Sequence, residues 1–256
     1  MSDETRLVGS DRVLAVLREL AQHGHGVGLE ALAKAVDSPK PTVHRALAAL
    51  RRAGLAAQDG RGRYVLGDEF LRLAFAHYEA RPDHLRVAPA LERLAALFGE
   101  TAHYAVLDGR SIVYRAKVDP PTGAVRLTST IGGRNPAHCT AVGKLLLSYT
   151  LRDDAAVAAW VGSGELDRRT EKTKVSTIEL GRELRAIREQ GYAVDDEENE
   201  PGVTCLAVPV FPASPTKPSG AISVSALAYR TPLRVLREAL PEIRAIVAGE
   251  ADERVR

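Results

Sequence analysis

Apolar positions recur every three or four residues along the N-terminal part of the chain, and this spacing predicts amphipathic helices over residues 10–23, 29–36 and 38–53. Ser10 and Ser38 are the expected N-caps of the first and third helices. A glycine follows each of these two helices, where a left-handed residue commonly ends a helix. The pattern therefore predicts a small bundle of three short helices.

A β-hairpin is predicted next, over residues 55–66, because two short apolar runs flank the turn Asp59-Gly60-Arg61-Gly62. Two further helices are expected over residues 68–80 and 84–98. The second of them is apolar on one face, and we expect this connector helix to pair with its copy in a dimer.

From residue 101 onward, segments with strand patterns and segments with helix patterns are mixed. Strands are expected over residues 101–107, 111–118, 125–130, 192–195, 205–211 and 221–227, and helices over residues 141–149, 153–161, 177–190 and 232–249. An Asp-Gly turn joins the first two strands, which favours antiparallel pairing. The fold class is therefore α+β, with helices packed on an antiparallel sheet that has a face available for a small ligand.

Length and composition are those of a globular protein with two domains, since 256 residues suit one small and one ordinary domain. No run of 18 apolar residues occurs and the first residues are polar, so we expect a cytoplasmic protein without a membrane span or a signal peptide. The two cysteines, Cys139 and Cys205, cannot form a disulfide framework and are expected to be thiols.

Charge is nearly balanced overall, at +2, but bases are concentrated in residues 38–63, where Asp59 is the single acid. Two short helices joined by a tight turn and followed by a hairpin fit a winged helix-turn-helix, whose second helix enters the major groove of double-stranded DNA. The residues expected to contact DNA are Lys40, Thr42, His44, Arg45, Arg51, Arg52, Arg61 and Arg63. The alternative is a plain helical bundle with a solvated basic surface. An acidic run over residues 195–200 predicts a solvated loop.

Candidate ligand-binding residues lie in the α+β part. They are Thr140, Ala141, Val142, Asp195, Cys205, Ser223 and Ser225. The first three begin a helix, where unpaired N–H groups favour an anion such as a carboxylate. The two serines lie two residues apart on one strand face, and Asp195 ends a strand where it can accept a hydrogen bond from a ligand hydroxyl. The pattern alone favours the alternative, in which the serines point outward, the cysteine is a core residue and Asp195 is an ordinary loop acid.

The segments over residues 28–47 and 63–67 resemble the winged helix-turn-helix of the IclR family of bacterial transcriptional regulators, and residues 136–147, 191–195, 202–210 and 221–225 resemble its effector domain. The resemblance implies a GAF-like effector domain, dimers or dimers of dimers, and control by small metabolites, often organic acids. It also implies a pocket formed by the helix start at Thr140, an acid at Asp195, the cysteine at Cys205 and the two strand serines. Pro41 departs from the family, which commonly has serine there; proline removes a hydroxyl and an N–H that could hold a phosphate.

Together these observations predict a ligand-responsive transcriptional regulator with operator DNA, a carboxylate effector and a second copy of the chain as partners, and with neither cofactor nor metal. The expected domains are a winged helix-turn-helix with its following helix (1–80), a linker helix (81–99) and an effector-binding domain (100–256). One alternative is an architectural DNA-binding protein without a ligand. Another is a thiol enzyme or a metal site at His138 and Cys139 or at Cys205, but the chain has no CxxC or HxxxH spacing.

Overall fold

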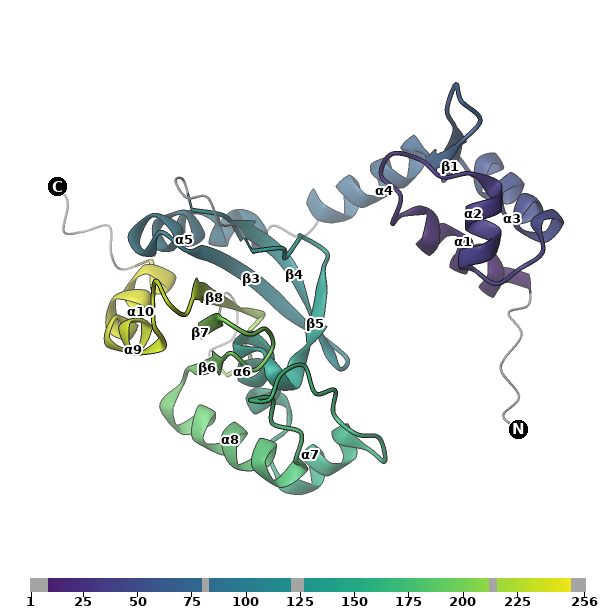
Figure 1. The fold of residues 1–256 in the computed structure, drawn as a ribbon. Coiled ribbons are helices and arrows are strands. Elements are labelled where there is room, and N and C mark those ends of the chain that lie inside the picture. The colour runs from purple at the N-terminus through teal and green to yellow at the C-terminus, as the bar shows by residue number, and fades with distance from the viewer. Residues whose placement is uncertain (1–8, 80–82, 121–126, 212–215, 250–256) are drawn as a thin grey trace. The chain divides into compact units, whose positions relative to one another are not determined.

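The computed structural model describes residues 9–79, 83–120, 127–211 and 216–249. The chain divides into two compact units, Met1–Pro82 and Asp83–Arg256, each built around its own apolar side chains (Figure 1). Within the described residues, no helix is both long enough and apolar enough to cross a membrane.

The first unit is a helical bundle with a hairpin. Its elements are α1 (Gly9–Leu20), α2 (Leu29–Ala35), α3 (Lys40–Arg52), β1 (Ala56–Gln58), β2 (Tyr64–Leu66) and α4 (Asp68–Glu79). The apolar stripes of α1, α2 and α3 meet in one core, which Tyr64 of the hairpin completes. Gly54, with φ of +71°, follows the end of α3. The three predicted helices and the hairpin are therefore confirmed.

Both N-caps predicted for this unit are wrong. Ser10 lies inside α1, which begins at Gly9. Pro39 is the N-cap of α3, and Ser38 Oγ instead donates a hydrogen bond to the carbonyl of Val36 at 3.3 Å. A proline with its φ fixed near the helical value can start a helix without a side-chain cap, which leaves the Ser38 hydroxyl free for the turn.

The second unit is an antiparallel six-stranded sheet, in the order β5-β4-β3-β8-β7-β6, with helices on both faces (Figure 1). The strands are β3 (Thr101–Asp108), β4 (Ser111–Val118), β5 (Arg134–Pro136), β6 (Ala193–Asp196), β7 (Val203–Val210) and β8 (Gly220–Leu227). The helices are α5 (Asp83–Phe98), the 3₁₀ helix η1 (Ala137–Cys139), α6 (Ala141–Thr150), α7 (Asp154–Val161), α8 (Thr177–Gln190), α9 (Leu233–Glu238) and α10 (Leu240–Ala248). The predicted α+β class is confirmed.

Alternation along the central strands assigns the two faces of this sheet. Leu206 belongs to the core formed with α5, α9 and α10, whereas its neighbour Ala207 belongs to the core formed with α6, α7 and α8. Successive side chains of a strand point to opposite faces. Cys205, Ser223 and Ser225 consequently lie on the face that α6 covers.

Two expectations for this unit need correction, and a third is tested only in part. The strand predicted over 125–130 is absent from residues 127–130, and its remaining part lies outside the described residues. The helix predicted over 232–249 is two helices that meet at Ala239, because Pro241 has no N–H to continue the helix. The apolar face of α5 is divided, since Leu91 and Leu94 pack on its own sheet whereas Leu85 and Leu97 are exposed at 64% and 46%; pairing of this helix with a second copy stays a prediction.

Candidate functional site

The third helix of the first unit presents a basic face opposite its buried stripe. Lys40, His44, Arg45, Arg51 and Arg52 are exposed, and Thr42 is half-buried. Lys40 Nζ lies 2.9 Å from Glu30 Oε1, but both side chains are exposed, and such surface ion pairs are weak enough to exchange for another anion. Small side chains at Ala48 and Ala49 leave this face without bulk. The face can therefore approach a polyanion closely.

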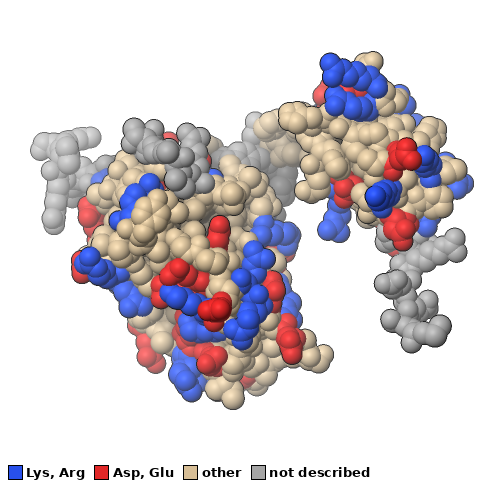
Figure 2. All heavy atoms as spheres, in the orientation of Figure 1, with Lys and Arg blue, Asp and Glu red and all other residues tan. Residues whose placement is uncertain are grey.

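Asp59 organises the tip of the β1–β2 hairpin. Its Oδ1 accepts hydrogen bonds from the N–H groups of Arg63 and Arg61 at 2.8 and 2.9 Å, and its Oδ2 accepts one from Arg63 Nε at 2.9 Å. These bonds, from Arg63 above all, lower the pKa of Asp59. Arg61 is exposed and has no ion pair within the described ranges. Figure 2 shows basic side chains gathered at this end of the unit.

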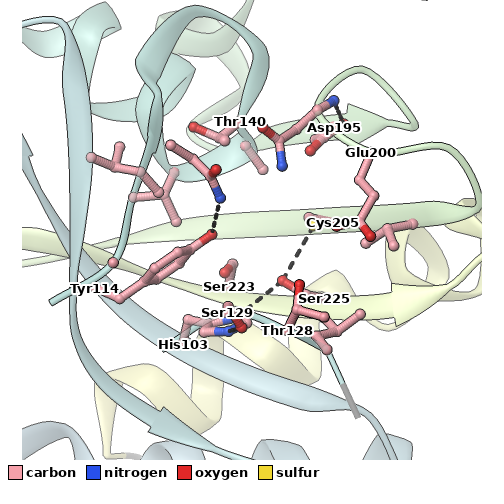
Figure 3. Close-up of a pocket in the computed structure, with 18 of the residues that line it drawn as sticks. His103, Tyr114, Thr128, Ser129, Thr140, Asp195, Glu200, Cys205, Ser223 and Ser225 are labelled. Carbon is pink, nitrogen blue, oxygen red and sulfur yellow. Dashed lines mark hydrogen bonds between the residues drawn. The ribbon is translucent and has the colours of Figure 1, made fainter. Parts of the chain in front are cut away.

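A cavity of about 260 Å³ lies on the α6 side of the sheet in the second unit (Figure 3). Its wall contains all the residues that the sequence suggests for a small ligand, namely Thr140, Ala141, Val142, Asp195, Cys205, Ser223 and Ser225. The strand register accounts for part of this convergence, since Asp195 pairs with Cys205 and Cys205 pairs with Ser225 across adjacent strands. Residues distant in the sequence thus form one surface.

One wall of the cavity is the start of α6. Thr140 caps this helix, because its Oγ1 accepts a hydrogen bond from the N–H of Gly143 at 3.2 Å. Glycine is required here, since a Cβ at residue 143 would lie 2.2 Å from the carbonyl oxygen of Ala137. The N–H groups of Ala141 and Val142 have no acceptor in the part of the chain that the structure describes. They lie at the positive end of the helix, which stabilises an anion.

A chain of hydrogen bonds crosses the sheet side of the cavity (Figure 3). Cys205 Sγ donates to Ser225 Oγ at 3.2 Å, Ser225 Oγ lies 3.2 Å from His103 Nδ1, and His103 Nε2 lies 2.8 Å from Ser129 Oγ. Burial lowers the pKa of His103 to about 3, so the imidazole is neutral and offers one donor and one acceptor. Burial also raises the pKa of Cys205, so its thiol keeps its proton.

Asp195 closes another side of the cavity at the end of β6. Its Oδ1 accepts hydrogen bonds from the N–H groups of Glu198 and Asn199 at 2.7 and 3.3 Å. Burial outweighs the attraction of Lys144 and raises the pKa of Asp195 to about 7. Near neutral pH the carboxyl is therefore divided between its acid and its anionic form.

The expectation of a solvated acidic loop over residues 195–200 is wrong for two of its members, since Asp195 and Glu198 are each only 2% exposed. Glu198 forms an ion pair with Lys144, a fully buried residue of α6, and Lys144 Nζ lies 2.7 Å from Glu183 Oε1. Lys174 Nζ lies 3.2 Å from Glu198 Oε1, the same oxygen that pairs with Lys144. The buried Lys144 thus holds Glu198 of the acidic segment inside the fold, next to α6, the helix whose start lines the cavity.

Several wall residues are not predicted by the sequence reasoning. They are His103, Tyr114, Ser129, Asn135, Arg169, Asn199 and Glu200. His103 carries the one available signal, a polar residue inside an otherwise apolar strand. Tyr114 OH accepts a hydrogen bond from Asn135 Nδ2 at 3.1 Å, a contact between segments whose pairing the sequence does not specify. Arg169 and Glu200 lie outside regular elements, where no periodicity identifies them.

Thiol chemistry finds no support at Cys139. Its side chain is buried, and burial raises its pKa to about 12, so no reactive thiolate forms near neutral pH. His138 Nε2 is engaged with the carbonyl of Asp167 at 2.9 Å. Among the described residues, no group of His, Cys, Asp and Glu side chains has the arrangement of a metal site.

Two family models match the chain. "IclR helix-turn-helix domain" covers residues 10–60, and "Bacterial transcriptional regulator IclR C-terminal" covers residues 84–251. The chain is 38% identical to the HTH-type transcriptional regulator KdgR of Escherichia coli over 202 residues, which are 78% of this chain and 75% of that protein. KdgR of Dickeya chrysanthemi has the same identity, and the match spans 65% of its length. The Pca regulon regulatory protein of Pseudomonas putida is 30% identical over 79% of this chain and 69% of its own length.

Solved structures agree with the fold over nearly the whole chain. An IclR transcriptional regulator from Alicyclobacillus acidocaldarius superposes with a TM-score of 0.75 at 24% identity, covering 95% of this chain and 98% of that one. A transcriptional regulator from Rhodococcus superposes with a TM-score of 0.71 at 28% identity, covering 93% and 97%. An IclR homologue from Microbacterium hydrocarbonoxydans, complexed with 4-hydroxybenzoate, has a TM-score of 0.72 at 21% identity and covers 93% and 99%.

Proposed function

The chain belongs to the IclR family of bacterial transcriptional regulators, and from this premise we propose that it binds operator DNA through α3 and the β1–β2 hairpin. When a small carboxylate occupies the cavity of the second unit, the affinity of the protein for this DNA rises or falls. Family membership makes it a DNA-binding regulator with an effector domain, and not an enzyme. The identity of the contacting residues, the effector and the oligomeric state are the proposal. We also propose that the protein acts in the cytoplasm, where bacterial DNA is found.

One observation carries the effector part of the proposal: the wall of the cavity contains the unpaired N–H groups of Ala141 and Val142 and also Arg169. Arg169 is exposed and has no ion pair within the described residues. A helix start and an arginine both favour an anion, and a carboxylate can accept hydrogen bonds from both.

The basic face of α3 supports the DNA part. Arg45 is exposed in the middle of this helix, where a guanidinium can form a bidentate contact with guanine in the major groove. Arg61, at the hairpin tip, is placed to lie against a phosphate beside the groove. The two residues therefore have different roles, one in sequence preference and one in general affinity.

We further propose a homodimer, or a dimer of dimers. Apolar side chains of α4 are exposed in the single chain, with Leu71 at 49%, Leu73 at 48% and Phe75 at 62%. Exposed apolar residues gathered on one helix favour burial against a partner. Two copies would also place two α3 helices on successive half-sites, which a single module cannot do.

The test is operator selection from random DNA with the purified protein, followed by affinity measurements on the selected fragment at several salt concentrations. Arg45→Ala should cost about 1–3 kcal/mol and relax the preference at one base position, and Arg61→Ala should weaken binding to all sequences and reduce the salt slope by about 1. Arg234→Ala, an exposed arginine of α9, is the matched control and should leave affinity unchanged. Unchanged affinity in both the Arg45 and the Arg61 variants would refute the proposed DNA-binding surface.

A further inference from the structure

The wall of the cavity contains a hydroxyl that no described residue bonds. Ser223 is 3% exposed, and its Oγ has no hydrogen-bond partner among the residues that the structure describes. It lies on the cavity wall between the ring of Tyr114 and the bonded pair of His103 and Ser225 (Figure 3). Because this hydroxyl faces the cavity, a ligand that supplies a donor or an acceptor can bond to it without breaking an internal hydrogen bond.

Two carboxyl groups on the cavity wall also lack a full set of donors. Asp195 uses Oδ1 for the backbone of its own loop, and the described residues provide no donor for Oδ2. Glu200 has no ion pair and no side-chain hydrogen bond in the described ranges. Glu200 lines the cavity, and Figure 3 shows its side chain on the same side as Cys205. The ionised form of a carboxyl only accepts hydrogen bonds, and the acid form of Asp195 can donate as well, so a ligand group that both donates and accepts suits this wall.

We propose that the effector is a short polyhydroxylated carboxylic acid, whose carboxylate lies on the N–H groups of Ala141 and Val142 and whose hydroxyl groups are bound by Asp195, Glu200 and Ser223. This inference rests on the proposed function, because it specifies the ligand of the same cavity. Hydroxyl groups both donate and accept, so they satisfy the carboxylates and the serine alike. An aliphatic or aromatic acid would bury these groups without partners, which is the situation that binding sites reject most strongly.

The volume of the cavity limits the length of the ligand. At about 260 Å³ it exceeds the ~150 Å³ of a cavity that admits one benzene molecule. An acid of about four to six carbons is therefore of suitable size, whereas a nucleotide or an acyl chain is not.

The experiment is a thermal-shift and calorimetric titration of the full-length protein with matched probes. Threonate and gluconate carry both a carboxylate and hydroxyls, butyrate and hexanoate carry the carboxylate alone, and threitol and glucitol carry the hydroxyls alone. At least one of the two hydroxy acids should raise the melting temperature and bind more than about tenfold tighter than both its deoxy acid and its polyol. Threonine, which has an ammonium in place of the C2 hydroxyl of threonate and lacks its C4 hydroxyl, and benzoate should bind more weakly than that hydroxy acid.

Two variants locate the effect. Ser223→Ala should lower the affinity for the hydroxy acid about fivefold to tenfold, since the contact with a ligand hydroxyl is lost. The weak affinity for the deoxy acid, which lacks that hydroxyl, should be unchanged. Glu200→Gln should do the same, and because Glu200 is exposed its replacement does not threaten folding. Lys217→Gln, a change of charge near a different cavity, is the control and should alter neither affinity.

The outcomes of these titrations test the proposed ligand class separately from the proposed regulatory function. Tighter binding of a deoxy acid, of benzoate or of threonine would overturn the hydroxy-acid inference, as would the absence of any response to the six probes. If the same preparation still retards its selected DNA fragment, the regulatory function stands while the ligand class is wrong. If it retards no fragment at all, the proposed function itself fails.

Discussion

Asp195 is deeply buried and is also one of the residues proposed to bind the ligand. Its carboxyl is 2% exposed and faces Lys144 and Glu198 from neighbouring elements, with Cys205 opposite it on β7. The net effect raises its pKa to about 7 from an ordinary value of 3.8. A group whose pKa is raised in this way holds a proton in the folded state that the unfolded chain has already released.

The contribution of Asp195 to the free energy of unfolding should therefore decrease as pH rises from about 4 to about 7, and Asp195→Asn should remove this contribution. Asparagine cannot ionise, but its amide oxygen can still accept the hydrogen bond from Glu198 N. Each pKa unit is worth about 1.4 kcal/mol, so the variant should gain a few kcal/mol over the parent protein between pH 4 and pH 8. Urea denaturation at both pH values measures this gain. His103 titrates in both proteins and cancels in the difference; a difference independent of pH would show that Asp195 ionises as an ordinary carboxyl.

Lys144 is fully buried, and its charge is compensated by the carboxylates of Glu183 and Glu198. Lys144→Met should destabilise the second unit by about 3–5 kcal/mol, because it leaves Glu198 buried with only the half-exposed Lys174 as a counter-charge. Lys172→Met is the matched control: Lys172 pairs with Glu197 at the surface, so its loss should change stability little. Chemical denaturation compares the two, and similar small losses would mean that the buried pair contributes nothing to stability.

The residues of the cavity show what sequence reasoning can reach. Alternation along a strand correctly places Ser223 and Ser225 on one face, and helix-start chemistry identifies Thr140, because both depend on local spacing. His103 becomes a neighbour of Ser225 only through the pairing of β3 with β8, and this long-range register has no local signal. The binding roles of all these residues remain predictions.

At the scale of elements, local signals predict where helices and strands begin far better than what they pack against. Helix α8 occupies the expected residues because a serine cap precedes it and Gly191, in the left-handed conformation, ends it. The apolar stripe of α5 is also visible in the sequence. The sequence could not show which of its residues face the chain's own sheet, and the structure places Leu91 and Leu94 there. Exposed apolar residues remain on both helices, Leu71, Leu73 and Phe75 on α4 and Leu85 and Leu97 on α5.

Phe75→Glu should therefore weaken self-association by about tenfold to a hundredfold, because it removes a large apolar side chain from the proposed interface and adds a charge. The side chain is 62% exposed in the single chain, so the fold of the first unit should be unaffected. Sedimentation at several concentrations measures the dimer constant, and circular dichroism checks the helices. Leu97→Glu, at an exposed position of α5, is the comparison variant. Dissociation by Leu97→Glu but not by Phe75→Glu would place the interface on α5.

At the scale of the whole molecule, the chain separates the proposed DNA surface and the cavity into different units, each with its own core. Effector binding can influence DNA binding only if the effector has different affinities for the two states of the protein. Any such coupling is a free energy shared by both ligands. It follows that DNA must alter effector affinity by the same factor by which the effector alters DNA affinity.

A coupling of about 1–3 kcal/mol, or roughly 5-fold to 150-fold in affinity, is expected between the selected operator and the most stabilising hydroxy acid. The operator dissociation constant should be measured with and without that acid, and the acid's constant with and without operator. Ser223→Ala provides the sharpest control, because its hydroxyl bonds to no described residue and its removal disturbs no internal contact, unlike that of Ser225, which bonds to His103. In this variant the effector concentration needed for the response should rise about fivefold to tenfold, while DNA affinity without effector stays unchanged. Two unequal coupling factors would mean that the two ligands do not act on one equilibrium, and a factor of one would leave the cavity without a regulatory role.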